Sequence, residues 1–108
     1  MKKLLVASSN QEVLGVVKNA CLNYFDYFEP IFCPDTEEAM SFVDYELPEI
    51  KILDFTSTDI DCDKILKAIS SDPWLHNGGI IAVATNPSEA QKIEDLKDPN
   101  ILIVQTLY

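Results

Sequence analysis

Five short apolar runs alternate with four segments of helical periodicity along this chain, and this alternation constrains its fold more than any other feature. Runs that are apolar on both faces are typical of buried parallel strands, which need helices on both sides. The expected strands are 4–7, 30–33, 50–55, 80–85 and 101–104, and the expected helices are 13–24, 35–43, 62–69 and 86–96. We therefore predict an α/β fold with a parallel five-stranded sheet and right-handed crossovers.

Capping residues at the helix starts support the same reading. Asp35 stands at the start of the second helical segment, and Glu38 lies three residues after Asp35, which is the pattern of a capping box. Asp61 is placed to cap the third helix, and Asn86 followed by Pro87 is typical of the start of the fourth.

The length of 108 residues fits one domain, 1–108, and the sequence leaves open whether it is a whole protein or the front part of a longer one. No stretch reaches the roughly 18 apolar residues of a membrane span. The first ten residues read as a strand and not as a signal peptide.

The charge balance excludes some partners. The chain has 18 acidic residues and 8 basic ones, all of them lysine, for a net charge of −10. Such a surface repels the phosphates of nucleic acids and anionic lipids, so we expect neither nucleic acid nor membrane as a partner. Cys21, Cys33 and Cys62 have no metal-ligand spacing, and we expect reduced, packed thiols in a cytoplasmic protein.

One stretch carries a resemblance to a family. Residues 48–54, PEIKILD, have a proline, an acid and then apolar residues leading into Asp54. This resembles the third strand of response-regulator receiver domains of bacterial two-component phosphorelay signalling, in which the aspartate accepts phosphate. Asp61 falls where the following loop usually has an aspartate, and 71–85 resembles the segment leading into the fourth strand. The resemblance covers the whole chain except the family's last helix, and implies a CheY-like, flavodoxin-like strand order 2-1-3-4-5.

The positions that complete the family's phosphorylation site differ here. Ser8 and Ser9 stand where the family has two acids that hold Mg²⁺. Ala84 stands where the fourth strand should end on a hydroxyl residue, with Thr85 one place late, and Gln105 lies nearest the place of the family's lysine. Hydroxyls are poor substitutes for the carboxylates that usually hold Mg²⁺, so we expect no metal and no other cofactor.

The loop after Asp54 departs from the family as well, with Thr58 in place of a proline. A phosphoryl group on Asp54 would face Asp59 and Asp61 with little compensation. Loss of the metal alone should slow phosphoryl transfer by roughly a thousandfold. We therefore predict a pseudo-receiver that has no catalytic residue and acts through contacts with a protein partner or an attached output domain.

Two other functions stay open at this point. The chain could be a true phospho-accepting receiver, with Asp54 in an atypical Mg²⁺ site. It could also be a flavodoxin-like cofactor-binding protein, in which 8–13 cradles a phosphate, although this turn has no glycine. The plainest interpretation of Asp54 is a solvated residue at the end of a strand. Trp74 and His76 are expected to be packing or partner residues.

The missing last helix predicts an uncovered surface. It leaves one face of the sheet bare beside the fifth strand, and we expect an apolar partner face there, made of Ile101, Ile103, Leu107 and Tyr108. Each large side chain contributes roughly 1.5–3 kcal/mol when it is fully buried. We therefore expect either a homodimer through this face and the strand edge, or a chain that continues into a covering helix.

Overall fold

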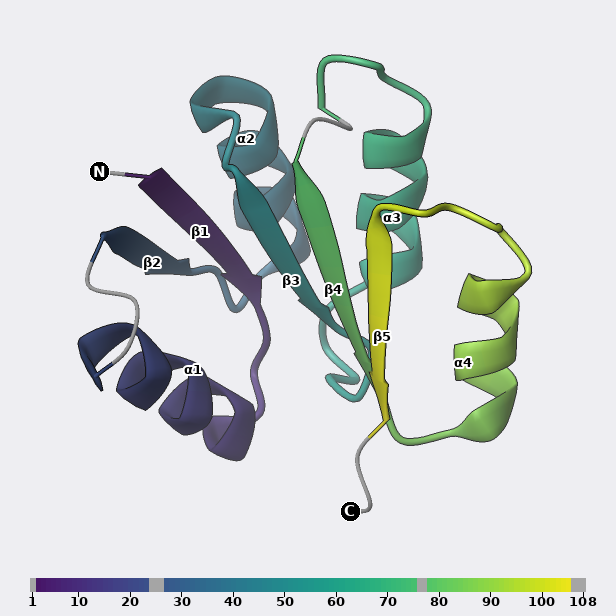
Figure 1. The fold of residues 1–108 in the computed structure, drawn as a ribbon, viewed down its shortest axis with the longest axis horizontal. Helices are drawn as coiled ribbons and strands as arrows, with labels where there is room; N and C mark the ends of the chain where they lie inside the picture. Colours follow the sequence, from purple (N-terminus) through teal and green to yellow (C-terminus); the bar gives the residue numbers. More distant parts are fainter. Residues whose placement is uncertain (1, 24–26, 76–77, 106–108) are drawn as a thin grey trace.

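The computed structural model describes residues 2–23, 27–75 and 78–105, in which five strands and four helices alternate (Figure 1). In chain order they are β1 (Lys2–Ala7), α1 (Gln11–Asn23), β2 (Phe28–Phe32), α2 (Thr36–Glu46), β3 (Ile50–Asp54), α3 (Cys62–Ser70), β4 (Gly79–Ala84), α4 (Pro87–Glu94) and β5 (Ile101–Gln105). The strands are all parallel and have the order β2-β1-β3-β4-β5. The predicted fold class and strand order are confirmed.

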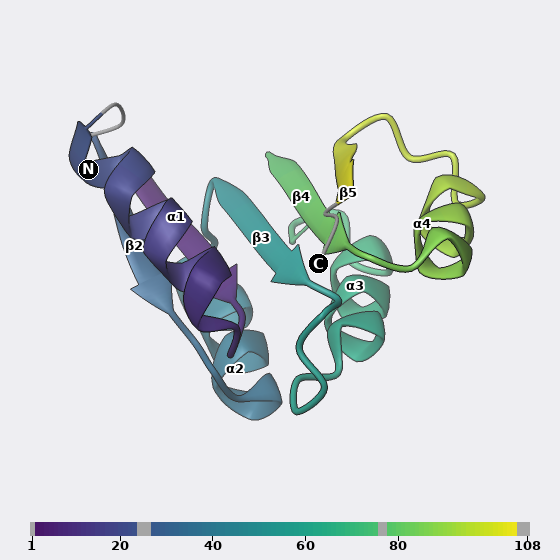
Figure 2. The same ribbon diagram turned by 90° about the horizontal axis from the view of Figure 1, so that it is seen from below.

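The alternation of side chains along β1 explains why its sequence is apolar on both faces. Leu5 and Ala7 belong to the larger core cluster, which α2 and α3 cover. Leu4 and Val6 belong to a smaller cluster, which is packed against α1. Figure 2 shows α2 and α3 together on one side of the sheet, and Figure 1 shows α4 beyond β5. β1 therefore separates two apolar layers.

The helix starts are as the sequence predicts. The side chain of Asp35 accepts hydrogen bonds from the N–H groups of Glu37 and Glu38. Asp61 accepts one from the N–H of Lys64, and Asn86 caps α4 with a proline in the first turn. None of the helices in the described part of the chain is both long and apolar enough to cross a membrane.

One glycine is required by the close approach of two backbones. Gly78, just before β4, has a φ of +87°, and a Cβ built on it would lie 1.9 Å from the carbonyl oxygen of Glu49. The next residue, Gly79, donates its N–H to that oxygen at 3.2 Å. Gly78 thus allows β4 to start directly beside β3.

The uncovered side of β5 differs from the sequence-based expectation. Leu102 and Val104 are 62% and 40% exposed and lie on the α1 side of the sheet. Ile101 and Ile103 are half-buried on the other side, where they line a hollow with α4. The prediction that Ile101 and Ile103 form the uncovered face is therefore wrong. Side chains alternate along β5, so these two lie on the side of α4, and Leu102 and Val104 lie on the uncovered side. The other two expected residues, Leu107 and Tyr108, lie outside the described residues.

Candidate functional site

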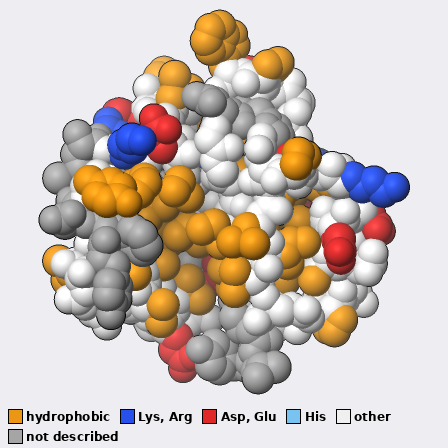
Figure 3. Space-filling model, in the orientation of Figure 1, with side chains coloured by type: hydrophobic (Ala, Val, Ile, Leu, Met, Phe, Trp, Pro, Cys, Tyr) orange, Lys and Arg blue, Asp and Glu red, His pale blue; other side chains and the backbone are white. Residues whose placement is uncertain are grey.

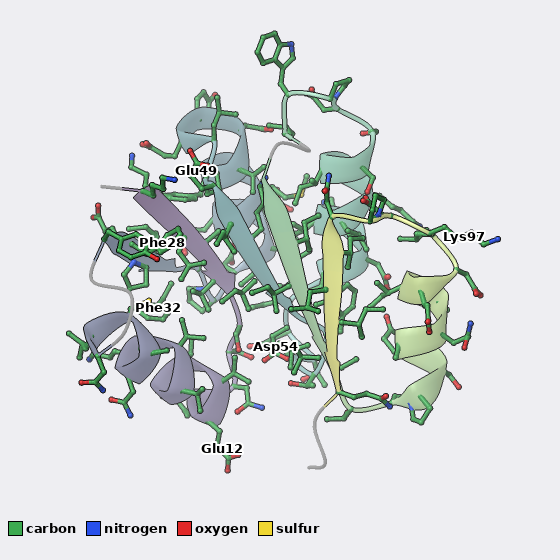
Figure 4. The ribbon with its side chains drawn as sticks, in the orientation of Figure 1. Glu12, Phe28, Phe32, Glu49, Asp54 and Lys97 are labelled. Atoms are coloured by element: carbon green, nitrogen blue, oxygen red, sulfur yellow. The ribbon has the colours of Figure 1, made fainter. Side chains whose placement is uncertain are left out.

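The carboxyl ends of β1 and β3 lie side by side and bring two sequence-predicted site residues together. Ala7 pairs with Leu53, so Ser8 and Asp54 follow at neighbouring positions. Asp54 is 0% exposed and Ser8 is also fully buried. Figure 4 shows Asp54 at this edge of the sheet. The interpretation of Asp54 as a solvated residue is wrong, because hydroxyl groups from two loops close over its carboxylate.

Four donors surround the carboxylate of Asp54. Its Oδ2 accepts from the Oγ of Ser8 at 2.6 Å and from the Oγ of Ser57 at 3.1 Å. Its Oδ1 accepts from the N–H and the Oγ1 of Thr56, at 3.0 and 2.5 Å. A carboxylate has about four lone-pair positions, so these donors satisfy it completely. We call Ser8, Thr56 and Ser57 the hydroxyl cage.

Further hydrogen bonds fix the hydroxyl cage in place. The N–H of Ser9 donates to the Oγ of Ser57 at 2.9 Å, and the N–H of Asn10 donates to the Oγ of Ser8 at 3.0 Å. The side chain of Asn10 also reaches the Oγ1 of Thr56 at 3.4 Å. The loop after β1 is thereby tied to the loop after β3, with the carboxylate at their centre.

No family model matches this chain, and no curated protein matches it. Among solved structures, the phosphorylated cyanobacterial phytochrome response regulator RcpA is similar with a TM-score of 0.79 and 22% identity, over 98% of this chain and 81% of that one. The signal receiver domain of a DNA-binding response regulator from Colwellia psychrerythraea 34H gives 0.78 and 19%, over 95% and 85%.

A third similar structure is the receiver domain of sensor histidine kinase PA1611 from Pseudomonas aeruginosa PAO1, with a magnesium ion coordinated in its active-site cleft. Its TM-score is 0.76 at 13% identity, over 99% of this chain and 86% of that one. The chain has the receiver-domain fold. At identities this low the likeness concerns the fold, and the chemistry has to be judged from the residues present.

The residues present do not fit the Mg²⁺ of the receiver fold. Mg²⁺ is held by oxygen lone pairs in near-octahedral geometry and is slow to give up its waters. Both oxygens of Asp54 already accept two hydrogen bonds, and the hydroxyl of Ser8 is committed as one of the donors. The hydroxyl of Ser9 donates to Asp59. In the described ranges, no group of three His, Cys, Asp or Glu side chains could hold a metal ion.

Among the described residues, the switch positions of the receiver fold donate no hydrogen bond to the carboxylate of Asp54. Ala84 and Gln105 pair at the ends of β4 and β5. Ala84 is buried, Thr85 is half-buried and Gln105 is exposed. Within the described residues, the side-chain oxygens of Asp54 accept hydrogen bonds from the hydroxyl cage alone. Neither Thr85 nor Gln105 is therefore among the donors to this carboxylate.

The acidic residues of the loop after β3 have structural partners. Asp59 accepts the hydroxyl hydrogen bond of Ser9, and Thr58 is exposed. Asp61 caps α3, and its own N–H donates to the Oγ1 of Thr36 at 2.9 Å, which ties α3 to the start of α2. Asp61 thus serves as a helix cap and not as a neighbour of the Asp54 carboxylate.

The turn after β1 is also unsuited to cradling a phosphate. The N–H groups of Ser9, Asn10 and Glu12 donate to Ser57, Ser8 and Asn10 respectively. A phosphate-binding helix start depends on N–H groups that point at the ligand. Here these groups are occupied within the protein, which argues against the flavodoxin-like alternative.

Two buried titratable side chains, Cys62 and Lys51, have shifted pKa values, and Cys62 contacts Asp54. Burial, and next the charge of Asp54, raise the pKa of the Cys62 thiol to about 12, and its Sγ donates to the backbone oxygen of Asp54 at 3.3 Å. Burial lowers the pKa of Lys51, against the opposing charge of Glu49. The Nζ of Lys51 donates to the carbonyl of Leu75 at 2.7 Å, at the opposite edge of the sheet, so it does not replace the family's lysine.

All three cysteines are free and buried, as predicted. Trp74 is 81% exposed, which excludes a packing role, and His76 lies outside the described residues. Sequence reasoning missed Thr56 and Ser57. The available signal was their spacing, since hydroxyl residues two and three places after an aspartate are typical partners for its side chain.

Proposed function

We propose that this chain is a receiver-like signalling module that acts through protein contacts, without phosphorylation of Asp54. The observation that carries the proposal is the buried carboxylate of Asp54, with four donors on its two oxygens. A phospho-acceptor carboxylate must present a free oxygen to the phosphorus atom. Here either oxygen would first have to give up two hydrogen bonds.

The charges around the site support the same conclusion. A phosphoryl group on Asp54 would add negative charge to a chain whose net charge is already −10, in a loop that also holds Asp59. Metal ions and fixed cations normally stabilise this charge during phosphoryl transfer. The nearest candidate on the same strand, Lys51, is committed to the opposite edge of the sheet.

In this proposal Asp54 is a structural residue. It joins the loops after β1 and β3 and so preserves the loop surface at this edge for recognition by a protein partner or an output domain. The absence of arginine and the acidic surface argue against nucleic acid as the partner. Free buried thiols fit a reducing, cytoplasmic setting of the bacterial type. No enzymatic activity is part of the proposal.

Incubation with acetyl phosphate and Mg²⁺, followed by mass spectrometry of the intact protein, tests the proposal. We expect the mass to stay unchanged, because both oxygens of the carboxylate are occupied and the described residues hold no group of three acids, histidines or cysteines that could bind the metal. Asp54→Asn is the matched control, since it removes the acceptor oxygen. A Mg²⁺-dependent gain of one phosphate that Asp54→Asn abolishes would establish the phospho-receiver alternative instead.

A further inference from the structure

Two adjoining hollows lie between α1 and the sheet, on the side that α1 covers only in part. Their volumes are about 190 and 260 Å³, and Val16, Val17, Ile52 and Ile81 line both of them. They therefore form one continuous groove, which we call the α1–β5 groove. Figure 3 shows hydrophobic side chains gathered in a band across the middle of this face.

The two walls of the α1–β5 groove carry exposed apolar side chains. Val16 on α1 and Val104 on β5 line the groove and are 65% and 40% exposed. Leu102, which is 62% exposed, lies at its edge, on the same face as Ile81, with which it pairs. Val83 and Val104 extend the lining toward the carboxyl ends of the strands. A contiguous apolar surface of this kind is typical of an interaction site.

Among the described residues that line the groove, one is charged, and this residue is acidic. Glu12 lies in the first turn of α1, where it lines the hollow nearest the carboxyl ends of the strands. Figure 4 shows its side chain pointing outward. The ion pairs found among the described residues join Lys3 to Glu46 and Lys64 to Glu37, so Glu12 is left without a cationic partner there.

We propose that the α1–β5 groove binds an amphipathic helix of a partner protein, with the apolar stripe of that helix against the sheet and a basic residue opposite Glu12. The inference deepens the proposed function, since it rests on the module acting through protein contacts. The strands that form the floor are five or six residues long, which at about 3.3 Å per residue gives about 17–20 Å. A helix of about three turns has this length.

A helix suits this groove better than an extended peptide. The floor consists of apolar side chains that stand on the sheet face, and the hydrogen-bonding groups of the strands point within the sheet. An extended peptide on this face would leave its own N–H and C=O groups unpaired against apolar atoms. A helix satisfies these groups internally and buries one apolar stripe.

Charge favours a basic partner over a second copy of this chain. Each copy has a net charge of −10, so two copies of the chain repel each other overall. Complementary charge speeds association and selects partners, whereas like charges oppose it. A partner helix with lysine or arginine outside its apolar stripe is complementary to the net charge of the chain and to Glu12 beside the groove.

The test measures binding of three fluorescent peptides to the full chain. Each peptide is long enough for about three helical turns. The probe has leucines at i, i+3, i+4 and i+7 and lysines elsewhere, which gives an apolar stripe and basic flanks. One control peptide has the same composition in a scrambled order, and the other has glutamates in place of the lysines. Fluorescence anisotropy gives the dissociation constants. We expect the probe to bind about tenfold or more tightly than either control.

Matched variants locate the binding surface. Leu102→Gln should weaken probe binding about tenfold, and Leu96→Gln, which alters a 54% exposed leucine near α4, should leave it unchanged. Val16→Gln tests the opposite wall and replaces Leu102→Gln if that variant does not fold. Glu12→Lys should weaken the probe and strengthen the glutamate peptide, and this difference should vanish at about 1 M salt.

Several results would overturn the inference. One is equal binding of the probe and the scrambled peptide, which would reduce the attraction to charge alone. Another is tight probe binding that Leu102→Gln and Val16→Gln leave unchanged. Absence of binding, or a stable dimer in sedimentation equilibrium that buries the groove, would also exclude it. These results are separate from the phosphorylation assay, so failure of the inference and failure of the proposed function are distinguishable.

Discussion

Replacing Asp54 by asparagine reverses the hydrogen-bonding sense of one side-chain atom without a change in size. The amide oxygen can still accept from the N–H and Oγ1 of Thr56. The amide nitrogen, in the place of Oδ2, becomes a donor that faces the hydroxyls of Ser8 and Ser57 at 2.6 and 3.1 Å. Both hydroxyls then lose the acceptor that they have in the native protein.

The magnitude follows from these two lost hydrogen bonds. Each hydroxyl already accepts one backbone N–H, from Asn10 to Ser8 and from Ser9 to Ser57, so its remaining capacity to accept from the new amide is limited. A hydrogen bond to a charged group contributes about 1.5–3 kcal/mol, and the amide recovers part of this. We expect the free energy of unfolding to fall by about 2–4 kcal/mol, out of about 5–15 kcal/mol for a domain of this size.

Urea unfolding followed by far-ultraviolet circular dichroism measures this loss. The matched control is Asp59→Asn, which removes the same charge from an exposed position in the same loop and should change stability by about 0.5 kcal/mol or less. A stability of Asp54→Asn equal to or above that of the wild type would refute the reasoning. That result is expected when an aspartate mainly faces other acids, because its neutralisation then relieves repulsion.

Three further outcomes are expected. Gly78→Ala should lower the free energy of unfolding by about 2–4 kcal/mol in the same assay, since the left-handed backbone and the contact with Glu49 both oppose a Cβ. The control is Gly15→Ala, which adds a Cβ in open space on a helix and should raise the free energy of unfolding by about 0.5–1 kcal/mol. Burial raises the pKa of Cys62 from 9.0 to about 12, so between about pH 9 and 12 the thiol is protonated in the folded protein and loses its proton on unfolding. The free energy of unfolding should therefore fall as the pH rises from about 9 toward 12. The slope should be at most about 1.36 kcal/mol per pH unit, and Cys62→Ala should lack this part of it. In cells, Asp54→Asn should keep its signalling output per folded molecule, measured at a temperature at which the variant stays folded, and loss of output with the fold intact would favour the phospho-receiver alternative.

The fold could be predicted because its determinants are local. The apolar runs, the caps at Asp35, Asp61 and Asn86, and the spacing of apolar residues in each helix all lie within a few residues of the element that they specify. The parallel order then follows from the handedness of the crossovers and the family resemblance.

Burial of Asp54 could not be predicted because it depends on register. Thr56 and Ser57 are close to Asp54 in sequence, but Ser8 lies 46 positions away and reaches the carboxylate through the pairing of β1 with β3. A sequence that has serines in place of an expected acid pair indicates loss of the metal site. It does not indicate that Ser8 becomes a hydrogen-bond donor to Asp54, the residue at the phospho-acceptor position.

The bare side of β5 could not be predicted for a different reason. Its first four residues are all apolar, so the strand has no alternation from which a face could be assigned. Only the pairing with β4, in which Ile80 lies opposite Ile101 and Ile81 opposite Leu102, fixes which side chains of β5 lie on the α1 side of the sheet. The half-buried Ile101 and the exposed Leu102 follow from that register.

A titration with Mg²⁺ and beryllofluoride, a mimic of the phosphoryl group, tests the central claim most directly. Amide resonances of Ser9, Asn10, Thr56 and Ser57 report on the hydroxyl cage, since their N–H groups lie in it or donate to it. We predict that these resonances do not move at millimolar concentrations, because the carboxylate of Asp54 is fully occupied and the described part of the chain places no group of three acids, histidines or cysteines where it could hold the metal. Saturable, Mg²⁺-dependent shifts of these amides that disappear in Asp54→Asn would contradict the account.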